Sequence, residues 1–474
     1  MLLFKSKLAK SASLLSLSQI FALFVSAVLI LILPKYVSVA DYGYWQLFVL
    51  YSGYVGLFHF GYSDGLYITL GGKDLSLIRV EDLKKQFSIF IFFQILFSVL
   101  IFLFSLNYFQ EFTKLYVFIA VSIYLIIENY HKLLSYMLLA TSNADIYAKS
   151  VIIDKTLTVV LIIVLIAGNQ LTFVTTIGTY IACRLISLVY LMIIYKEFSI
   201  VILNLKEFLS VFNNVIRTCK LGIILTISNI LGTLIIASGR LVVEYSWSIT
   251  AFAQISLAVS LSFFIMSFIS QISLILFPIL CNAGKSMQKK ILKEGSIIIG
   301  YLAMWGFGFY FIICLFINYW LPDYKESLNY LIYLFPIVLF EIKTQILYTT
   351  YCKSINKLKL LLTVNVFVIV LALIMYYIAS ITHSINLILI TMLLALMLRS
   401  ILLNLFLYIH YDLKLNRYFY IEIIFSVLFL FINSTFGIQY LLLTFILAMI
   451  VITLVYKEDL KLIYLNYKNR TNGL

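Results

Sequence analysis

Long apolar stretches separated by short polar breaks recur along almost the whole chain. Each stretch has about 18–25 residues, enough for an α-helix to cross roughly 30 Å of hydrocarbon. The breaks, for example those at 71–74, 168–170 and 321–323, carry Gly, Pro, Asn or charged residues. The pattern predicts fourteen membrane spans, at residues 12–33, 44–64, 87–106, 113–139, 151–168, 171–195, 219–239, 249–280, 296–317, 327–350, 360–381, 384–409, 418–434 and 437–456.

Composition indicates the same class of protein. Of the 474 residues, 63% are apolar and 11% are charged, and a soluble domain cannot bury such an apolar fraction. We therefore expect an all-α, polytopic membrane protein. The basic N-terminus is followed by an apolar run that small polar residues interrupt, which predicts a retained first helix and not a cleaved signal. Five scattered cysteines without a C-x-x-C pair predict neither disulfides nor a metal site, and no motif indicates a cofactor.

The positions of Lys and Arg predict the orientation of the spans. With a cytoplasmic N-terminus, 25 of the 34 Lys and Arg residues fall in or beside inside segments, and the outside segments hold only Lys35, Lys114, Arg240 and Lys325. Because cytoplasmic segments are enriched in these residues, we expect both termini in the cytoplasm. The net charge of +14 is then a topology signal and indicates no nucleic-acid partner. The outside segments are short, which leaves no room for an external catalytic domain, so we expect no enzyme activity.

Two pairs of segments indicate an internal repeat. SVADYGYWQLFVLYSG (38–53) resembles YSWSITAFAQISLAVS (245–260), and ENYHKLLSY (128–136) resembles EIKTQILYT (341–349). The offsets, measured from Gln46 to Gln254 and from Glu128 to Glu341, are 208 and 213 residues, or about half the chain. A duplication of six spans produces such offsets, and transporters of this design carry their substrate between the halves.

The repeat predicts a division of the chain into two six-helix lobes and a C-terminal pair of helices. We expect the first lobe at residues 1–200 and the second at residues 215–410. Residues 411–474 then hold the last two spans and a basic cytoplasmic tail. Repeats of this parallel kind are related by an axis along the membrane normal.

The span at 113–139 carries an unusual charged cluster. A charge at the centre of a membrane helix costs about 2.5–3.5 kcal/mol, yet Glu128, His131 and Lys132 lie on one face of this helix. Glu128 and Lys132 are spaced to form a structural pair along the helix. The same face can instead line a hydrated cavity, where His131 and Glu128 exchange protons and Lys132 binds an anion.

Other spans repeat this polar character. Glu341 and Gln345 in the span 327–350 have the spacing of the first cluster. Arg184 and Arg399 lie well inside their spans, so each requires a buried partner. A third set of residues forms polar seams that serve either tight helix packing or a hydrated interior: Asn229, Thr233, Ser260 and Gln271.

Some motifs resemble those of a known family. ADYGYWQLF (40–48), FGYSDGL (60–66) and the region from Arg240 through AFAQISLA (251–258) are similar to the second- and eighth-helix regions of bacterial polysaccharide flippases. These belong to the multidrug/oligosaccharidyl-lipid/polysaccharide exporter superfamily. The resemblance implies two lobes related by a pseudo-twofold axis, a central cavity lined largely by spans 1, 2, 7 and 8, and transport by alternating access in the bacterial inner membrane.

The charge balance within the spans favours an anionic cargo, because the predicted spans contain five Lys and Arg residues and few carboxylates. We therefore expect a flippase for undecaprenyl-diphosphate-linked oligosaccharide repeat units, in the biosynthesis of lipopolysaccharide O-antigen or of a capsule polysaccharide, coupled to a proton or sodium ion. The candidate diphosphate and glycan ligands are Lys35, Lys132, Arg184, Arg240, Lys343 and Arg399. The candidate coupling residues are Glu128, His131 and Glu341, and the candidate cavity seam is Asn229, Thr233, Ser260, Gln271 and Gln345.

Two other functions remain open at this point. A cation-coupled multidrug/toxin antiporter has the same span pattern, but it requires unpaired acids in its cavity. A membrane polysaccharide polymerase or glycosyltransferase requires paired acids near an outer loop, whereas Asp41 and Glu111 each stand alone in theirs. A flippase of the expected kind implies a polysaccharide polymerase and a chain-length regulator as partners.

Overall fold

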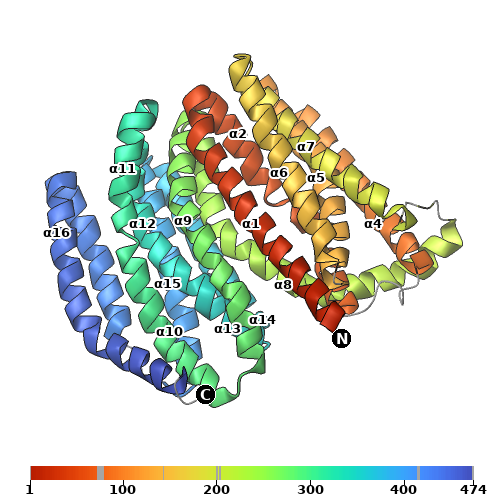
Figure 1. The fold of residues 1–474 in the computed structure, drawn as a ribbon. Helices are drawn as coiled ribbons and strands as arrows, with labels where there is room; N and C mark the ends of the chain where they lie inside the picture. The colour runs from red at the N-terminus through yellow and green to blue at the C-terminus, as the bar shows by residue number, and fades with distance from the viewer. Residues whose placement is uncertain are drawn as a thin grey trace. The chain divides into compact units, whose positions relative to one another are not determined.

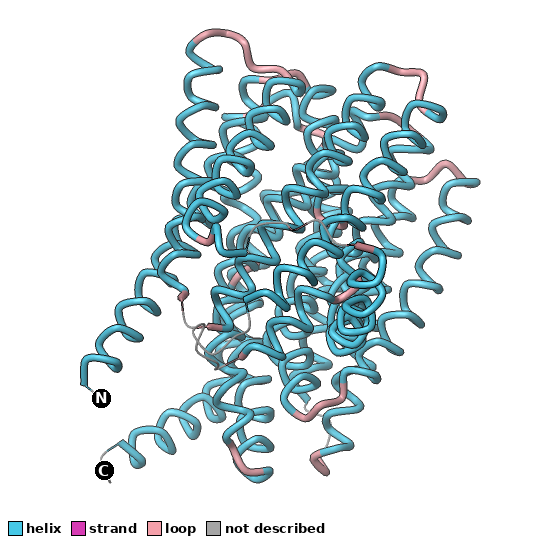
Figure 2. The backbone as a smooth tube through the Cα atoms, turned by 90° about the vertical axis from the view of Figure 1, so that its right-hand side faces the viewer, coloured by secondary structure: helices cyan, strands magenta, loops and turns pink. Residues whose placement is uncertain are grey.

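Helices form nearly all of the computed structural model, which describes residues 2–71, 80–141, 143–198, 201, 204–413 and 417–471. Figure 2 shows these helices joined by short loops, and no strand occurs in the described ranges. Ten described helical segments are long and apolar enough to cross a membrane. The chain is therefore an all-α, multi-pass membrane protein, as predicted. The total of fourteen spans stays a prediction.

The chain divides into two compact units, Met1–Gly232 and Thr233–Leu474, here called unit 1 and unit 2. The boundary falls inside one long helix, α8 (Leu205–Ser246). Before α8, unit 1 contains α1 (Leu2–Tyr36), α2 (Val39–Ser52), the 3₁₀ helix η1 (Val55–His59), α3 (Tyr62–Leu70), α4 (Val80–Tyr108), α5 (Phe112–Ala140), α6 (Ala144–Ala167), α7 (Phe173–Ile194) and η3 (Lys196–Phe198). Within unit 1, α5, α6 and α7 lie side by side (Figure 1).

Unit 2 begins with the second part of α8. It continues with α9 (Ile249–Asn282), α10 (Lys285–Trp305), α11 (Gly308–Trp320), η4 (Pro322–Tyr324), α12 (Ser327–Lys343), the π-helix η5 (Thr344–Thr349), α13 (Thr350–Ser354), α14 (Leu358–Ile381), α15 (Ile385–His410) and α16 (Arg417–Thr471). The predicted lobes at 1–200 and 215–410, and the C-terminal segment 411–474, stay predictions.

Short polar residues determine where several helices begin. Ser38 accepts a hydrogen bond from the N–H of Asp41 (3.0 Å) at the start of α2. Thr172 and Thr175 form a capping box at the start of α7. Each cap gives a hydrogen-bond partner to a backbone N–H of the first turn, which has no partner inside the helix. The polar breaks between apolar stretches therefore define helix starts as well as loops.

The predicted span at 44–64 is not one continuous helix. α2 ends at Ser52, η1 follows as a short 3₁₀ segment, and α3 starts at Tyr62. Phe60 and Gly61, between η1 and α3, have φ values of 46° and 79°, which lie outside the right-handed helical region. The interruption leaves some backbone carbonyls in the apolar part of the unit without a hydrogen-bond partner in their own helix.

Side chains from neighbouring helices satisfy those carbonyls. Asn129 of α5 donates to the carbonyl of Val55 (2.9 Å), and Gln94 of α4 donates to the carbonyl of Phe58 (3.0 Å). Asn129 also donates to Gln94 (2.7 Å). Non-helical backbone at membrane depth requires such internal partners because no water is available. Two buried amides thus hold the broken segment in place.

α8 crosses α3 in direct backbone contact. A Cβ atom placed on Gly222 would lie 2.1 Å from the carbonyl oxygen of Gly61 and 2.5 Å from the nitrogen of Gly65. A Cβ placed on Gly65 would lie 2.0 Å from the carbonyl oxygen of Thr218. These distances leave no space for any side chain, so the crossing requires glycine at both helices.

Unit 2 also departs from regular helix inside predicted spans. The span 327–350 changes from α12 to the π-helix η5 directly after Lys343. π-helical turns are rare and are frequent at functional sites. The helix predicted at 296–317 is divided at Gly306 into α10 and α11. η5 directly continues α12, and both α10 and α11 pack against α12.

α16 folds back on itself. The rings of Tyr418 and Tyr456 lie 4.1 Å apart, and those of Phe425 and Phe445 lie 6.4 Å apart. A straight helix would separate Tyr418 from Tyr456 by about 57 Å at 1.5 Å per residue. The chain therefore reverses its direction between Phe425 and Phe445, and the two arms of α16 lie side by side (Figure 1).

Candidate functional site

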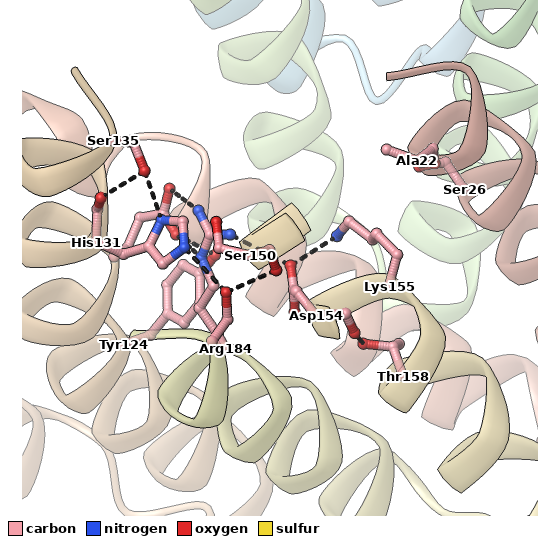
Figure 3. Close-up of polar contacts among 12 residues, drawn as sticks. Ala22, Ser26, Tyr124, His131, Ser135, Ser150, Asp154, Lys155, Thr158 and Arg184 are labelled. Atoms are coloured by element: carbon pink, nitrogen blue, oxygen red, sulfur yellow. Dashed lines mark hydrogen bonds and ion pairs between the residues drawn. The ribbon is translucent and has the colours of Figure 1, made fainter. Parts of the chain in front are cut away.

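A charged network joins three helices of unit 1 (Figure 3). Arg184 of α7 binds Glu128 of α5 through two nitrogens, Nε at 2.7 Å and Nη2 at 3.1 Å. Tyr124 donates a further hydrogen bond to Glu128 (2.8 Å). This fork-like contact is the strongest geometry available to a carboxylate and a guanidinium group. Glu128 therefore pairs with another helix, not along its own helix with Lys132.

The network continues into α6. Arg184 Nη1 lies 3.2 Å from Asp154 Oδ2, and Lys155 Nζ lies 3.4 Å from the same oxygen. Lys155 also lies over the ring of Tyr180, 5.3 Å from its centroid. The requirement for a buried partner of Arg184 is thus met by two acids. These two acids and two cations balance one another.

His131 extends the network along α5 through neutral groups. Its Nε2 atom lies 3.1 Å from the hydroxyl of Ser187, which donates to the carbonyl of Ser150 (2.8 Å). Its Nδ1 atom lies 3.2 Å from the hydroxyl of Ser135. His131 is buried, and both ring nitrogens have hydroxyl neighbours. The imidazole therefore links α5 to α6 and α7 through Ser187 and Ser150.

A second polar cluster of unit 1 surrounds the broken segment. Asp64 of α3 accepts a short hydrogen bond from the hydroxyl of Thr226 on α8. His59 Nε2 lies 3.9 Å from Asp64 Oδ2 and 3.1 Å from Lys132 Nζ. Lys132 also lies over the ring of Tyr136, 5.3 Å from its centroid. Lys132 contacts an imidazole and a ring but no carboxylate in the part of the chain that the structure describes.

Unit 2 contains a comparable ion pair. Arg399 of α15 contacts both oxygens of Glu341 on α12, at 3.1 and 3.2 Å. Gln345, in the π-helix η5, donates to Glu341 (2.7 Å). The side chains of Arg399 and Glu341 are only 2% and 5% exposed. The predicted seam residue Gln345 and the predicted coupling acid Glu341 thus meet directly.

Lys343 belongs to a separate buried pair. Its ammonium group lies 2.8 and 2.9 Å from the two oxygens of Glu422 on α16. Gly300 of α10 makes room for this pair, because a Cβ there would lie 2.1 Å from a Glu422 oxygen. Sequence reasoning missed Glu422, although its position inside an apolar span was a signal. Lys343 therefore holds an acid of the protein itself.

The two units repeat one pairing. In each, an acid of the predicted fourth or tenth span binds an arginine of the predicted sixth or twelfth span. The sequence separations are nearly equal, 56 residues for Glu128 and Arg184 and 58 for Glu341 and Arg399. The correspondence between Glu128 and Glu341 thus extends to their partners Arg184 and Arg399. Neither arginine belongs to the segments whose similarity indicated the repeat.

The other predicted site residues lie outside these pairs. Arg240 donates to the hydroxyl of Ser256 (2.8 and 3.1 Å) and lies over the ring of Phe252. Lys35 is exposed in the last turn of α1. Among the seam residues, Asn229 and Thr233 are exposed, Ser260 is half-buried, and the side chain of Gln271 lies outside the described residues.

Unit 1 also contains an apolar cavity of about 360 Å³ beside the broken segment. Aromatic rings from η1, α4 and α8 dominate its lining, including Phe58, Phe93 and Phe212. His59 and Lys220 contribute polar groups. The lining suits hydrocarbon better than a charged group.

Comparisons with solved structures place this geometry in a known fold. Lipid II flippase MurJ in an inward closed conformation is similar over 95% of this chain and 99% of that chain, with a TM-score of 0.61 and 13% sequence identity. The chain has the MOP transporter fold. An inward-facing multidrug resistance MATE family transporter of the MOP superfamily also matches, over 83% of this chain and 98% of that chain, with a TM-score of 0.51 and 12% identity. No family model and no curated protein sequence matches the chain.

Within the MOP fold, the described ion pairs connect helices inside each unit. They consist of carboxylates, guanidinium and ammonium groups, and no group of three His, Cys, Asp or Glu residues that could hold a metal ion occurs in the described residues.

Proposed function

We propose that the chain is a flippase that moves an undecaprenyl-diphosphate-linked oligosaccharide across the bacterial inner membrane by ion-coupled alternating access. The fold similarity to a lipid II flippase supports transport of a lipid-linked cargo. The pattern of internal ion pairs supports an anionic head group. Both termini would be cytoplasmic, and a polysaccharide polymerase and a chain-length regulator would use the product, an O-antigen or related repeat unit.

The observation that carries this proposal is that four acids within the helices, Glu128, Asp154, Glu341 and Glu422, are neutralised by cations of the protein. Glu128 and Asp154 bind Arg184, and Glu341 binds Arg399. A carrier of organic cations needs acids that are available to its cargo, whereas these acids already have cationic partners of fixed geometry. A diphosphate cargo instead needs a cation that is not held by an acid of the protein.

Lys132 meets that requirement in unit 1. Its ammonium group contacts His59 and Tyr136, neither of which carries the full negative charge that would hold it. Phosphate oxygens are stronger acceptors for an ammonium group than an imidazole or a ring face. We assign Lys132 to the diphosphate, and we keep Arg240 and Lys35 as further candidates. Arg184, Lys343 and Arg399 serve as partners of protein acids.

A multidrug antiporter is the second candidate, since a MATE transporter shares the fold. This alternative would require Asp64, or an acid released from its ion pair, to bind an organic cation. We propose no catalytic reaction for the chain.

Ligand binding to the purified protein separates the two candidates. We expect a short-chain prenyl-diphosphate oligosaccharide to raise the unfolding temperature, with stabilisation of about 2.7 kcal/mol at a ligand concentration 100 times Kd. Lys132→Gln should weaken this binding about tenfold or more, because a charge-assisted contact to phosphate contributes roughly 1.5–3 kcal/mol. The matched control is Lys289→Gln, since Lys289 contacts only a backbone carbonyl in the described structure. Stabilisation by a cationic dye, and none by the diphosphate, would support the antiporter instead.

A further inference from the structure

The apolar cavity of unit 1 lies where α4 and the first part of α8 meet the broken segment. Phe93 of α4 contacts Phe212 of α8, with ring centroids 5.9 Å apart. Phe97 of α4 contacts Phe58 and Phe60 of the broken segment, at 5.5 and 5.4 Å. All five rings line the cavity, and Phe60 is 49% exposed. The rings therefore form the wall of an accessible space and not a closed core.

The polar groups inside the cavity already have partners within the protein. Gln94 donates to a backbone carbonyl and accepts a hydrogen bond from Asn129. Both ring nitrogens of His59 have polar neighbours, at 3.0 and 3.1 Å. The hydroxyl of Tyr62 donates to Gln86 (3.2 Å). Because a polar occupant would lose its hydrogen bonds to water without replacement here, the interior suits an apolar chain.

Lys220 of α8 gives this apolar cavity a charged edge. It lines the cavity and is also exposed, so it lies at the opening. Arg217 is exposed as well, three residues earlier and on the same side of the helix. Within the described residues, neither cation contacts an acid. The predicted span 219–239 begins beside Lys220, and span ends lie at the level of the lipid head groups. Phosphate oxygens suit both cations.

The size of the cavity decides which apolar chain fits. A cavity of about 150 Å³ in another protein holds benzene, so a volume of about 360 Å³ holds roughly fourteen carbon atoms. That is most of one acyl chain of a membrane phospholipid. An undecaprenyl chain has eleven isoprene units and is several times too large. The cavity therefore suits a phospholipid of the surrounding membrane and not the prenyl chain of the proposed cargo.

We infer that unit 1 binds an anionic phospholipid at this cavity, with one acyl chain between α4 and α8 and the head-group phosphate at Lys220 and Arg217. The acyl chain packs against Phe58 and Phe60 of the broken segment. Because a ligand that binds only the folded state stabilises it, the lipid holds the broken segment against α8. The site does not depend on the proposed cargo, since its lining excludes Lys132.

Native mass spectrometry of the delipidated full-length protein, titrated with phospholipids, tests the site. We expect one tightly bound phosphatidylglycerol, and at least fivefold weaker binding of phosphatidylcholine with the same acyl chains. Lys220→Gln should weaken the tight phosphatidylglycerol binding about fivefold, the contribution of one basic residue to binding an anionic lipid surface. The matched control is Lys206→Gln, since Lys206 is exposed on the same helix and lies outside the cavity lining. This control should bind phosphatidylglycerol as the unmodified protein does.

A second variant fills the cavity and leaves its charges in place. Ile216 lines the cavity and is 36% exposed, so Ile216→Trp should occupy the space of the acyl chain and abolish the tight binding. Leu221→Trp is the control, because Leu221 is 53% exposed on the same helix and does not line the cavity. Equal binding of the two phospholipids, or tight binding that persists in Ile216→Trp, would overturn the site. Displacement of phosphatidylglycerol by a short-chain prenyl diphosphate would also overturn it, since the cargo would then occupy the cavity.

Discussion

Arg399→Leu should destabilise the protein by about 3–5 kcal/mol, because it leaves Glu341 buried without its charge partner. Both side chains are almost fully buried, and Arg399 contacts both carboxylate oxygens. The double substitution Glu341→Leu with Arg399→Leu should recover most of the loss, since it removes both charges together. Heat or denaturant unfolding of each variant in detergent measures its free energy of unfolding.

An exposed pair provides the matched control for this prediction. Arg417 pairs with Asp459 in α16, and the Arg417 side chain is 67% exposed. Arg417→Leu should therefore cost less than about 1 kcal/mol. If Arg399→Leu costs no more than Arg417→Leu, the pair between α12 and α15 does not stabilise unit 2.

Gly222→Ala should disrupt the crossing of α8 and α3, with a loss of about 3 kcal/mol or more of stability. The added methyl group would overlap the Gly61 carbonyl and the Gly65 nitrogen, which are backbone atoms that cannot rotate away. The Asp64–Thr226 contact lies one turn further along α8 and should be lost as well. Thermal unfolding and the hydrogen exchange of α8 measure the two effects.

Gly284→Ala is the control for this second change. No atom lies within 4 Å of a Cβ at Gly284, and its φ of −66° suits alanine. We expect a change within about 0.5 kcal/mol, as for most open surface positions. Equal stability of the two variants would show that α8 does not approach α3 as closely as described.

Hydropathy predicted the helices well because a membrane span needs a long apolar stretch and little else. The predicted span 113–139 therefore corresponds to α5, and the predicted span 327–350 begins with α12 and continues into η5. The break in 44–64 was harder to predict, since its cause is tertiary. Asn129 and Gln94 supply the missing hydrogen bonds from other helices, and α8 approaches through Gly222.

The partners of the charged residues were also tertiary. Spacing along one helix favoured Glu128 with Lys132, but the fork of Arg184 provides two hydrogen bonds to the same carboxylate from a separate helix. The sequence predicted that Arg184 and Arg399 need buried partners and did not identify them. Glu422 and Asp64 received no role from spacing, because neither has a charged neighbour on its own helix at three or four residues. The glycines at 61, 65 and 222 were the available signal for the close crossing.

Transport in reconstituted liposomes tests the central proposal most directly. The measurement follows a fluorescent prenyl-diphosphate oligosaccharide from one leaflet to the other, under a proton gradient, by its accessibility to an external quencher. We expect flipping well above the rate in protein-free liposomes, slower flipping with Lys132→Gln, and no uptake of a cationic dye. A rate equal to that of protein-free liposomes, together with proton-driven dye uptake, would contradict a lipid-linked anionic cargo.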